Sequence, residues 1–309
     1  MPKKLVLRII MMVKRIFLMS EYNLLLTCSG WEDRFIEGLN NNISNHQVDR
    51  IVVFNINEFL GRTEKNRAVL HQRFVAHNIT EMEVSLLDDV KTWRALENFF
   101  KENEIEEKKL MVDITTMPRF LIWFLMHFIN RHNNKANYIY YKPNKYEQCS
   151  WLTSEAEKPR LVFKHSGISL SDRPTILIIQ TGFDIERVYQ MIYSYEPKKV
   201  FLGAQVGDQF DNMSNNLKKH KEHLQFQEIE YFEMDAFNSP YGNDEIKEII
   251  EKNHDSHNII LSSFGPKPSA VAMFNLSMEF PNVGLSYVIV KSYNDSYSHG
   301  INIEDQIFI

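Results

Sequence analysis

The sequence has little cysteine and no strong excess of charge of either sign. Only two of its 309 residues are cysteine, and the formal net charge is −5. Cys28 and Cys149 lie too far apart for a CxxC motif, which argues against a disulfide framework and against a zinc site. A reducing, cytoplasmic environment fits this cysteine usage. The mild acidity excludes a generally basic surface that would coat duplex nucleic acid, but it leaves a local phosphate site open.

Several well-known catalytic and cofactor motifs are also missing. The sequence contains no GxGxxG or GxxxxGK[ST] loop, so nothing in it indicates a dinucleotide cofactor or a Walker-type NTPase. No serine lies in a GxSxG elbow, and none of the eleven histidines forms an HExxH motif. We therefore expect neither a cofactor nor a bound metal.

Long hydrophobic runs are absent as well. Residues 1–18 mix basic and apolar side chains, but Lys14 and Arg15 interrupt the apolar stretch. What remains is too short for a membrane span, and it has no small-residue cleavage site. We expect an N-terminal extension over residues 1–18 and no transmembrane segment, with the fold beginning near Met19. A basic amphipathic surface helix is the alternative.

What the sequence does contain is an internal duplication with an offset of about 150 residues. Residues 29–32 (SGWE) and residues 181–184 (TGFD) each follow an apolar run, and the order of hydroxyl, glycine, aromatic and acid recurs 152 positions later. The pairs Pro118-Arg119 and Pro266-Lys267 recur 148 positions apart. Landmarks that keep one order and nearly one spacing predict two related units. The length of the chain independently predicts two domains.

Each half alternates short apolar runs with amphipathic segments of helical length. Continuous apolar strands separated by helices indicate a parallel sheet that is covered on both faces. The predicted fold is therefore α/β, with two tandem, doubly wound, mainly parallel five-stranded Rossmann-like units. These units span residues 19–145 and 174–309, and residues 146–173 form a linker. A strand-like run at residues 161–163 suggests that the linker holds a hairpin of its own.

Four loops carry the residues best suited to ligand binding, because ligands of open parallel sheets bind beyond the carboxyl ends of the strands. In each unit these are the loops after the first and fourth predicted strands. The fourth-strand loops combine hydroxyl donors, a proline suited to a first helical turn and a cation, a combination that favours phosphate. The predicted ligand-binding residues are Ser29, Gly30, Trp31, Glu32, Arg34, Thr115, Thr116, Arg119, Thr181, Gly182, Phe183, Arg187, Ser262, Ser263, Gly265 and Lys267.

These residues also have a purely structural interpretation. Serine and threonine before proline are ordinary helix N-caps, and acids in a first turn favour the helix dipole without any function. Trp31 and Phe183 are placed to stack on a base, but such residues more often pack against a neighbouring helix. The recurrence of hydroxyl, proline and cation in both units favours the functional interpretation.

Asp113 ends the predicted fourth strand of the first unit, where it could act as a general base, a metal ligand or an acceptor for a ribose hydroxyl. Its counterpart in the second unit is Ser262. Any catalysis is therefore expected to be asymmetric and centred on the first unit. Whether the chain is an enzyme stays open at this point.

The arrangement of the four loops resembles that of the CRISPR-associated Rossmann-fold sensors, the CARF domains. Their relatives, the SAVED domains of anti-phage signalling systems, look like two such units in one chain. The resemblance rests on residues 29–34 and 113–119 with residues 181–187 and 262–267, and it spans most of residues 19–309. It implies a cyclic oligonucleotide or related nucleotide between the lobes, and a separate effector protein as partner. The sequence departs from the family at residues 116–118 (TMP), where many members carry a Gly-rich, Thr-Lys stretch.

Three hypotheses about function follow. The first is a nucleotide-recognition protein that binds a phosphate-rich ligand between two quasi-equivalent lobes, in an anti-phage or stress-signalling system. The second is a phosphoribosyl-type transferase or a nucleotide phosphodiesterase that uses Asp113. The third is a scaffold subunit of a multiprotein complex, because a duplicated fold does not determine function.

Overall fold

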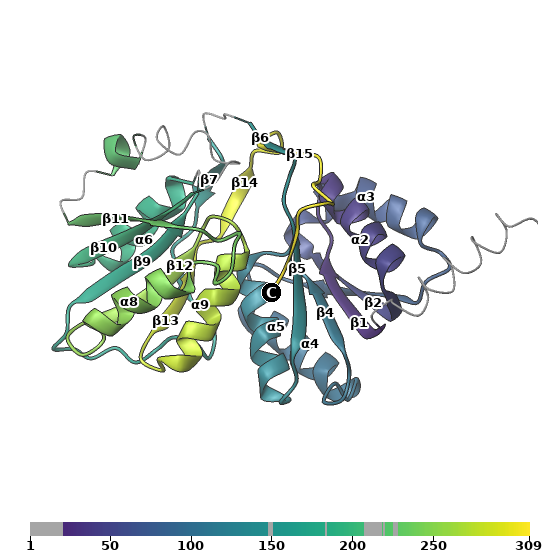
Figure 1. The fold of residues 1–309 in the computed structure, drawn as a ribbon, viewed down its shortest axis with the longest axis horizontal. Coiled ribbons are helices and arrows are strands. Elements are labelled where there is room, and N and C mark those ends of the chain that lie inside the picture. Colours follow the sequence, from purple (N-terminus) through teal and green to yellow (C-terminus); the bar gives the residue numbers. More distant parts are fainter. Residues whose placement is uncertain (1–20, 148–150, 183, 207–217, 219, 225–227) are drawn as a thin grey trace, which may run out of the picture.

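The computed structural model describes the chain except residues 1–20, 148–150, 183, 207–217, 219 and 225–227. The predicted extension over residues 1–18 and the predicted site residue Phe183 therefore lie outside the described residues. Two α/β lobes stand side by side, the first in purple and blue and the second in green and yellow (Figure 1).

The first lobe is built on a six-stranded sheet with the order β16-β5-β4-β1-β2-β3. Its five central strands are parallel, and only β16 is antiparallel to its neighbour β5. The strands are β1 (Glu21–Cys28), β2 (Gln47–Ile56), β3 (Ile79–Val84), β4 (Leu110–Asp113), β5 (Ala136–Tyr141) and β16 (Gln306–Phe308). The helices are α2 (Asp33–Asn45), α3 (Leu60–Arg73), α4 (Asp89–Glu102) and α5 (Arg119–Arg131), with a 3-10 turn η1 (Asn57–Phe59).

The second lobe repeats this strand order in a sheet that runs β11-β10-β9-β12-β13-β8. Here too five strands are parallel, and the sixth, β8, is antiparallel to β13. The strands are β8 (Arg160–Leu161), β9 (Thr175–Thr181), β10 (Lys199–Gln205), β11 (Ile229–Met234), β12 (Asn258–Ser263) and β13 (Gly284–Tyr287). The helices whose bounds are described are α6 (Glu186–Tyr195), α8 (Asn243–Asn253) and α9 (Pro268–Glu279).

Each sheet thus has six strands where five were expected. The additional strands β8 and β16 are only two and three residues long, too short to show an apolar pattern. The run at residues 161–163 forms no hairpin within the linker, because β8 pairs with β13 instead. The strand β16, at the end of the range assigned to the second unit, belongs to the sheet of the first lobe.

Helices cover both faces of each sheet, because successive residues of a strand point to opposite sides. In β1, Leu24 and Leu26 belong to the core that contains α4 and α5, whereas Leu25 belongs to the core under α2 and α3. In β9, Ile178 faces α8 and α9, whereas Leu177 faces α6. This alternation confirms that the sheets are covered on both faces.

The two lobes share one hydrophobic core. Helices α5 and α9 pack against each other in the middle of the molecule (Figure 1), and the core on either side of them is continuous. Nine of the thirteen residues of α5 are buried, as expected for a helix enclosed on several sides. The indole nitrogen of Trp123 in α5 donates a hydrogen bond of 2.8 Å to the carbonyl of Ala270 in α9. No helix in the described part of the chain is long and apolar enough to cross a membrane.

Two stretches of chain pass between the lobes at one end of the molecule (Figure 1). The first, residues 145–147 with 151–156, contains β6 (Lys145–Tyr146) and β7 (Thr153–Ala156). The second, residues 290–299, contains β14 (Val290–Tyr293) and β15 (Ser298–His299). They form two antiparallel pairs, β6 with β15 and β7 with β14. We call residues 145–147 with 151–156, and residues 290–299, the crossing segments.

Candidate functional site

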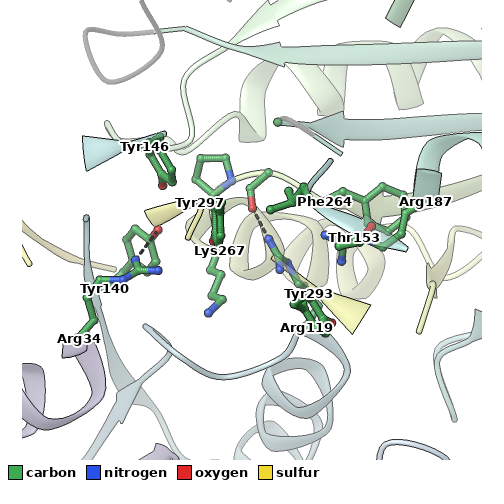
Figure 2. Close-up of a pocket in the computed structure, with 14 residues that line it drawn as sticks. Arg34, Arg119, Tyr140, Tyr146, Thr153, Arg187, Phe264, Lys267, Tyr293 and Tyr297 are labelled. Carbon is green, nitrogen blue, oxygen red and sulfur yellow. Dashed lines mark hydrogen bonds between the residues drawn. The ribbon is translucent and has the colours of Figure 1, made fainter. Parts of the chain in front are cut away.

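Two adjoining cavities lie between the lobes, and both are lined by Arg119, Lys267, Tyr293 and Tyr297. The first has a volume of about 570 Å³ including its open mouth, and we call it the polar cavity. Its other lining residues are Arg34, Tyr140, Tyr146, Leu152, Thr153, Gly182, Arg187, Phe264, Gly265 and Pro266 (Figure 2). The second has a volume of about 630 Å³, also counted with its mouth, and we call it the aromatic cavity. Its other lining residues are Cys28, Ser29, Gly30, Trp31, Glu32, Ile56, Phe59, Thr116, Met117 and Pro118.

The position of the cavities follows from the duplication. We call the space between the lobes that holds both cavities the cleft. The loops after β1 and β4 of the first lobe meet the loops after β9 and β12 of the second lobe there. Helix α5 begins at Arg119 and α9 begins one residue after Lys267, so both cations stand at helix N-termini. This is the edge at which ligands of open parallel sheets bind.

Arg119 and Lys267 form reciprocal bonds across the cleft. The Arg119 guanidinium donates to the carbonyl of Gly265 in the second lobe, and the Lys267 ammonium donates to the carbonyl of Thr115 in the first (Figure 2 draws the Arg119 bond). Each cation thus reaches the fourth-strand loop of the opposite lobe. The symmetry of this exchange matches the 148-residue offset of the two residues.

Neither of these cations has a carboxylate partner within the described part of the chain. Arg119 and Lys267 form no ion pair there, and the buried Nε of Arg119 has no hydrogen-bond acceptor. Burial lowers the pKa of Lys267 to about 7, with further repulsion from Arg119 and Arg34. Burial, together with the charge of Arg187, lowers the pKa of Arg119 to about 10. The cleft therefore holds two basic groups that no side chain of the described residues pairs in an ion pair.

Two further arginines line the polar cavity, and each of them is paired. Arg34 donates from Nε to Glu32 over 2.7 Å, and Arg187 donates from Nε to Asp184 over 2.6 Å. In each pair the acid lies in the loop after the first strand of its lobe and the arginine lies in the first turn of the helix that follows. Both pairs are almost fully buried, although Glu32 keeps some exposure. Arg34 also donates to the carbonyl of Tyr141 over 3.0 Å. These equivalent pairs are a second sign that the two lobes contribute matching walls.

Most of the residues predicted from sequence line the cavities. Ser29, Gly30, Trp31, Glu32 and Thr116 line the aromatic cavity. The polar cavity is lined by Arg34, Gly182, Arg187 and Gly265, and both cavities by Arg119 and Lys267.

Four predicted hydroxyl residues line neither cavity, because their side chains bond within their own lobe. The Thr115 hydroxyl accepts from the amide of Tyr141 over 3.0 Å. Thr181 shares a hydrogen bond of 3.2 Å with His220. Ser262 donates to the carbonyl of Ser286 over 2.8 Å, and Ser263 bonds Ser269 over 2.8 Å. These hydroxyls hold the loops in place instead of facing the cleft.

Asp113 also lies away from both cavities. Its carboxylate accepts from the side chain of Asn42 and from the amide of Thr115, each over 2.9 Å. Burial raises the pKa of this carboxyl group. Asp113 thus ties β4 to α2, and the geometry gives no support to a catalytic role for it in the cleft.

Trp31 forms part of a wall of packed rings. Its ring centroid lies 5.5 Å from that of Phe59 and 5.5 Å from that of Tyr293. The guanidinium of Arg62 lies 4.1 Å from the centroid of the same indole. Arg62 also forms an ion pair with Asp295, so it fastens the second crossing segment to the first lobe. The indole lines the aromatic cavity, and its contacts with Phe59, Tyr293 and Arg62 hold the ring in place.

Sequence reasoning missed the tyrosines of the cleft. Tyr140 lies in β5, whereas Tyr146, Tyr293 and Tyr297 lie in the crossing segments. A signal was present, because Tyr146 and Tyr293 are 147 positions apart and follow the fifth strand of their lobes. That spacing agrees with the duplication, so the same alignment of the halves would have found this pair.

Comparisons with known proteins add little to this geometry. No protein-family model matches the chain, and no curated protein matches it. Among solved structures, the chain is similar to the cytoplasmic domain of a prokaryotic cation chloride cotransporter, at 9% identity over 90% of this chain and 98% of that one. The TM-score is 0.24, a similarity too low to carry any argument. Within the described residues, no group of three or more histidine, cysteine or acidic side chains is arranged to hold a metal ion.

Proposed function

We propose that this chain binds a phosphate-bearing ligand of the nucleotide class in the cleft between its two Rossmann-like lobes. One observation carries the proposal: Arg119 and Lys267 come from equivalent positions, line both cavities and have no carboxylate partner among the described residues. A cation held in a protein interior without a counter-charge is costly. An anion bound between the two residues would remove that cost.

The surroundings suit phosphate in particular. Helices α5 and α9 both begin at the cleft, and the helix dipole favours an anion at a helix N-terminus. Arginine and lysine form charge-assisted hydrogen bonds with phosphate oxygens. The tyrosine hydroxyls of the polar cavity add neutral donors.

A sensor role is part of the proposal. Arg119 and Lys267 now bond carbonyls of the opposite lobe, and a phosphate would compete with those carbonyls for the same donors. A ligand that binds one arrangement of the lobes better than another shifts the protein toward it. In the signalling system that the loop arrangement suggests, a separate effector protein would respond to that shift.

The test is calorimetric titration of the purified chain with nucleoside monophosphates and cyclic oligonucleotides. Arg119→Ala and Lys267→Ala should each weaken binding by about 10- to 100-fold, the size expected for one charge-assisted hydrogen bond. Lys252→Ala is the matched control, because Lys252 is an exposed cation on α8 that lines neither cavity. Affinity that survives both cleft substitutions would overturn the proposal, as would the failure of every phosphorylated compound to bind.

A further inference from the structure

The two cavities differ in chemistry although they share a wall. The polar cavity presents Arg34, Arg187 and tyrosine hydroxyls to its interior (Figure 2). The aromatic cavity is bordered by the rings of Trp31 and Phe59 and by the apolar side chains of Ile56 and Met117. A ligand that fills both must therefore have one strongly anionic part and one apolar part.

The charge of the anionic part follows from the side chains around the cleft. Four cations line it, and two of them, Arg34 and Arg187, are already neutralised by Glu32 and Asp184. The remaining two basic groups are Arg119 and Lys267, which stand on the wall common to both cavities, and Lys267 supplies its charge when an anion draws a proton to it. A third or fourth negative charge on the ligand would find only arginines that are already paired, and it would be repelled by their carboxylates.

The shape of the apolar part follows from the wall of packed rings. Trp31 is held by contacts with Phe59 and Tyr293, and by Arg62 at 4.1 Å. Because these neighbours already fix the position of the indole, it offers a rigid, flat surface to a ligand. Planar groups stack favourably on aromatic rings, and a few polar residues in an apolar pocket fix the orientation of a ligand.

We propose that the ligand is an organophosphate dianion whose two negative charges lie at Arg119 and Lys267 and whose planar apolar group occupies the aromatic cavity. This inference rests on the proposed function and specifies the ligand for it. Two sources share this chemistry: one phosphate monoester, or two phosphodiesters within one molecule.

The protonation of Lys267 gives the inference an independent signature. Its pKa of about 7 reflects burial, repulsion by Arg119 and Arg34, and weaker attraction by Glu32. The neighbouring Cys28 thiol stays uncharged, because burial raises its pKa to about 12. Asp113 is also close enough to interact electrostatically with Lys267. At pH 8 most Lys267 side chains are neutral, so a dianion that binds the charged amine draws a proton from solvent.

Calorimetry with simple probes on the full chain tests the inference at pH 8, where phosphate monoesters are dianions because their second pKa is about 6. Phenyl phosphate should bind at least about tenfold more tightly than methyl phosphate, since only the former buries a ring. It should also bind more tightly than diphenyl phosphate, a monoanion with two rings. A cyclic dinucleotide that binds more tightly than phenyl phosphate assigns the two charges to two diesters, and one that binds less tightly assigns them to one monoester.

Two further readouts separate a specific site from general attraction. Trp31→Leu should bring the affinity ratio of phenyl to methyl phosphate close to one, whereas Tyr193→Leu, which removes an exposed ring on α6, should not change it.

Titrations in buffers of different ionisation enthalpy should show uptake of ~1 proton per phenyl phosphate, and Lys267→Arg should abolish that uptake because arginine stays charged.

The failures can be told apart. Equal affinity for phenyl and methyl phosphate, or tighter binding of ATP than of AMP, would overturn this inference while phosphate binding itself stood. Binding without proton uptake would overturn the role of Lys267 in holding the second charge. Failure of all phosphate probes would overturn the proposed function together with the inference.

Discussion

Arg119 and Lys267 define the cleft at the scale of single residues. Each stands at the start of a helix and reaches a carbonyl of the opposite lobe. A carbonyl offers a partial charge, so it offsets only part of the cost of removing a cation from water. The protein therefore keeps two electrostatically unfavourable side chains at one place, as binding sites commonly do.

This arrangement predicts that Lys267→Met stabilises the protein without ligand. The substitution removes an enclosed amine that has no carboxylate partner among the described residues, and it keeps an unbranched apolar chain of similar length. We expect the free energy of unfolding at pH 7 to rise by about 1–2 kcal/mol, measured by urea denaturation. Lys252→Met, at an exposed site, should change it by less than about 0.5 kcal/mol. Destabilisation by Lys267→Met would show that the amine is a structural element of the fold.

The same residue predicts how stability depends on pH. The pKa of Lys267 falls from its ordinary 10.5 to about 7 on folding, because burial disfavours the charged amine. Between these values the unfolded chain binds more protons than the folded chain, so this residue makes stability rise with pH. The advantage of Lys267→Met over wild type should therefore shrink by about 1–2 kcal/mol between pH 7 and pH 8.5. A constant or growing advantage in urea denaturation would contradict the assignment.

At the scale of elements, the contact between α5 and α9 joins the lobes. Trp123 is fully buried in the shared core, and its indole bonds the carbonyl of Ala270. We expect Trp123→Leu to lower the free energy of unfolding by about 2–4 kcal/mol, because it leaves a cavity and removes a buried hydrogen bond between the lobes. Unfolding should remain a single transition, since the core is continuous across both lobes.

Trp151→Leu is the control for that substitution, because Trp151 is largely exposed. It should leave the free energy of unfolding within about 0.5 kcal/mol of wild type. Two separate transitions in the wild-type protein, detected by fluorescence and circular dichroism, would contradict a shared core.

Much of this element arrangement could be predicted from sequence. The apolar runs and their order gave the five parallel strands of each lobe, and the recurrence of Pro118-Arg119 at Pro266-Lys267 located both helix starts at the cleft. The sixth strands could not be predicted. A strand as short as β8 or β16 is defined by its partner across the sheet and not by a pattern of its own.

The sequence could not predict in which direction the polar side chains of the loops point. Thr115 and Ser262 occur where a phosphate cradle would place hydroxyls, but each bonds a backbone group on a neighbouring strand. A buried hydroxyl takes the partner that lies nearest, and that partner is distant in sequence. Cations are easier to predict, since a long side chain at a helix start has few directions other than the cleft.

At the scale of the whole molecule, the duplication explains why the site has two halves and why the halves differ. Equivalent loops supply Glu32 with Arg34 and Asp184 with Arg187, and equivalent helix starts supply Arg119 and Lys267. The crossing segments then close the cleft: the first contributes Tyr146, and the second contributes Tyr293 and Tyr297. One pocket assembled from two related walls is suited to a ligand that contacts both lobes at once.

A double-mutant cycle on phenyl phosphate binding tests the central claim most directly, because it asks whether Arg119 and Lys267 act on the same anion. Isothermal titration would compare wild type with Arg119→Gln, Lys267→Gln and the double variant. We predict that each single substitution weakens binding at least tenfold. The affinity loss of the double variant should be smaller than the product of the two single losses, because both residues bind the same anion and removing one already weakens its contact with the other. Full affinity in either single variant, or strictly additive losses, would contradict a shared site.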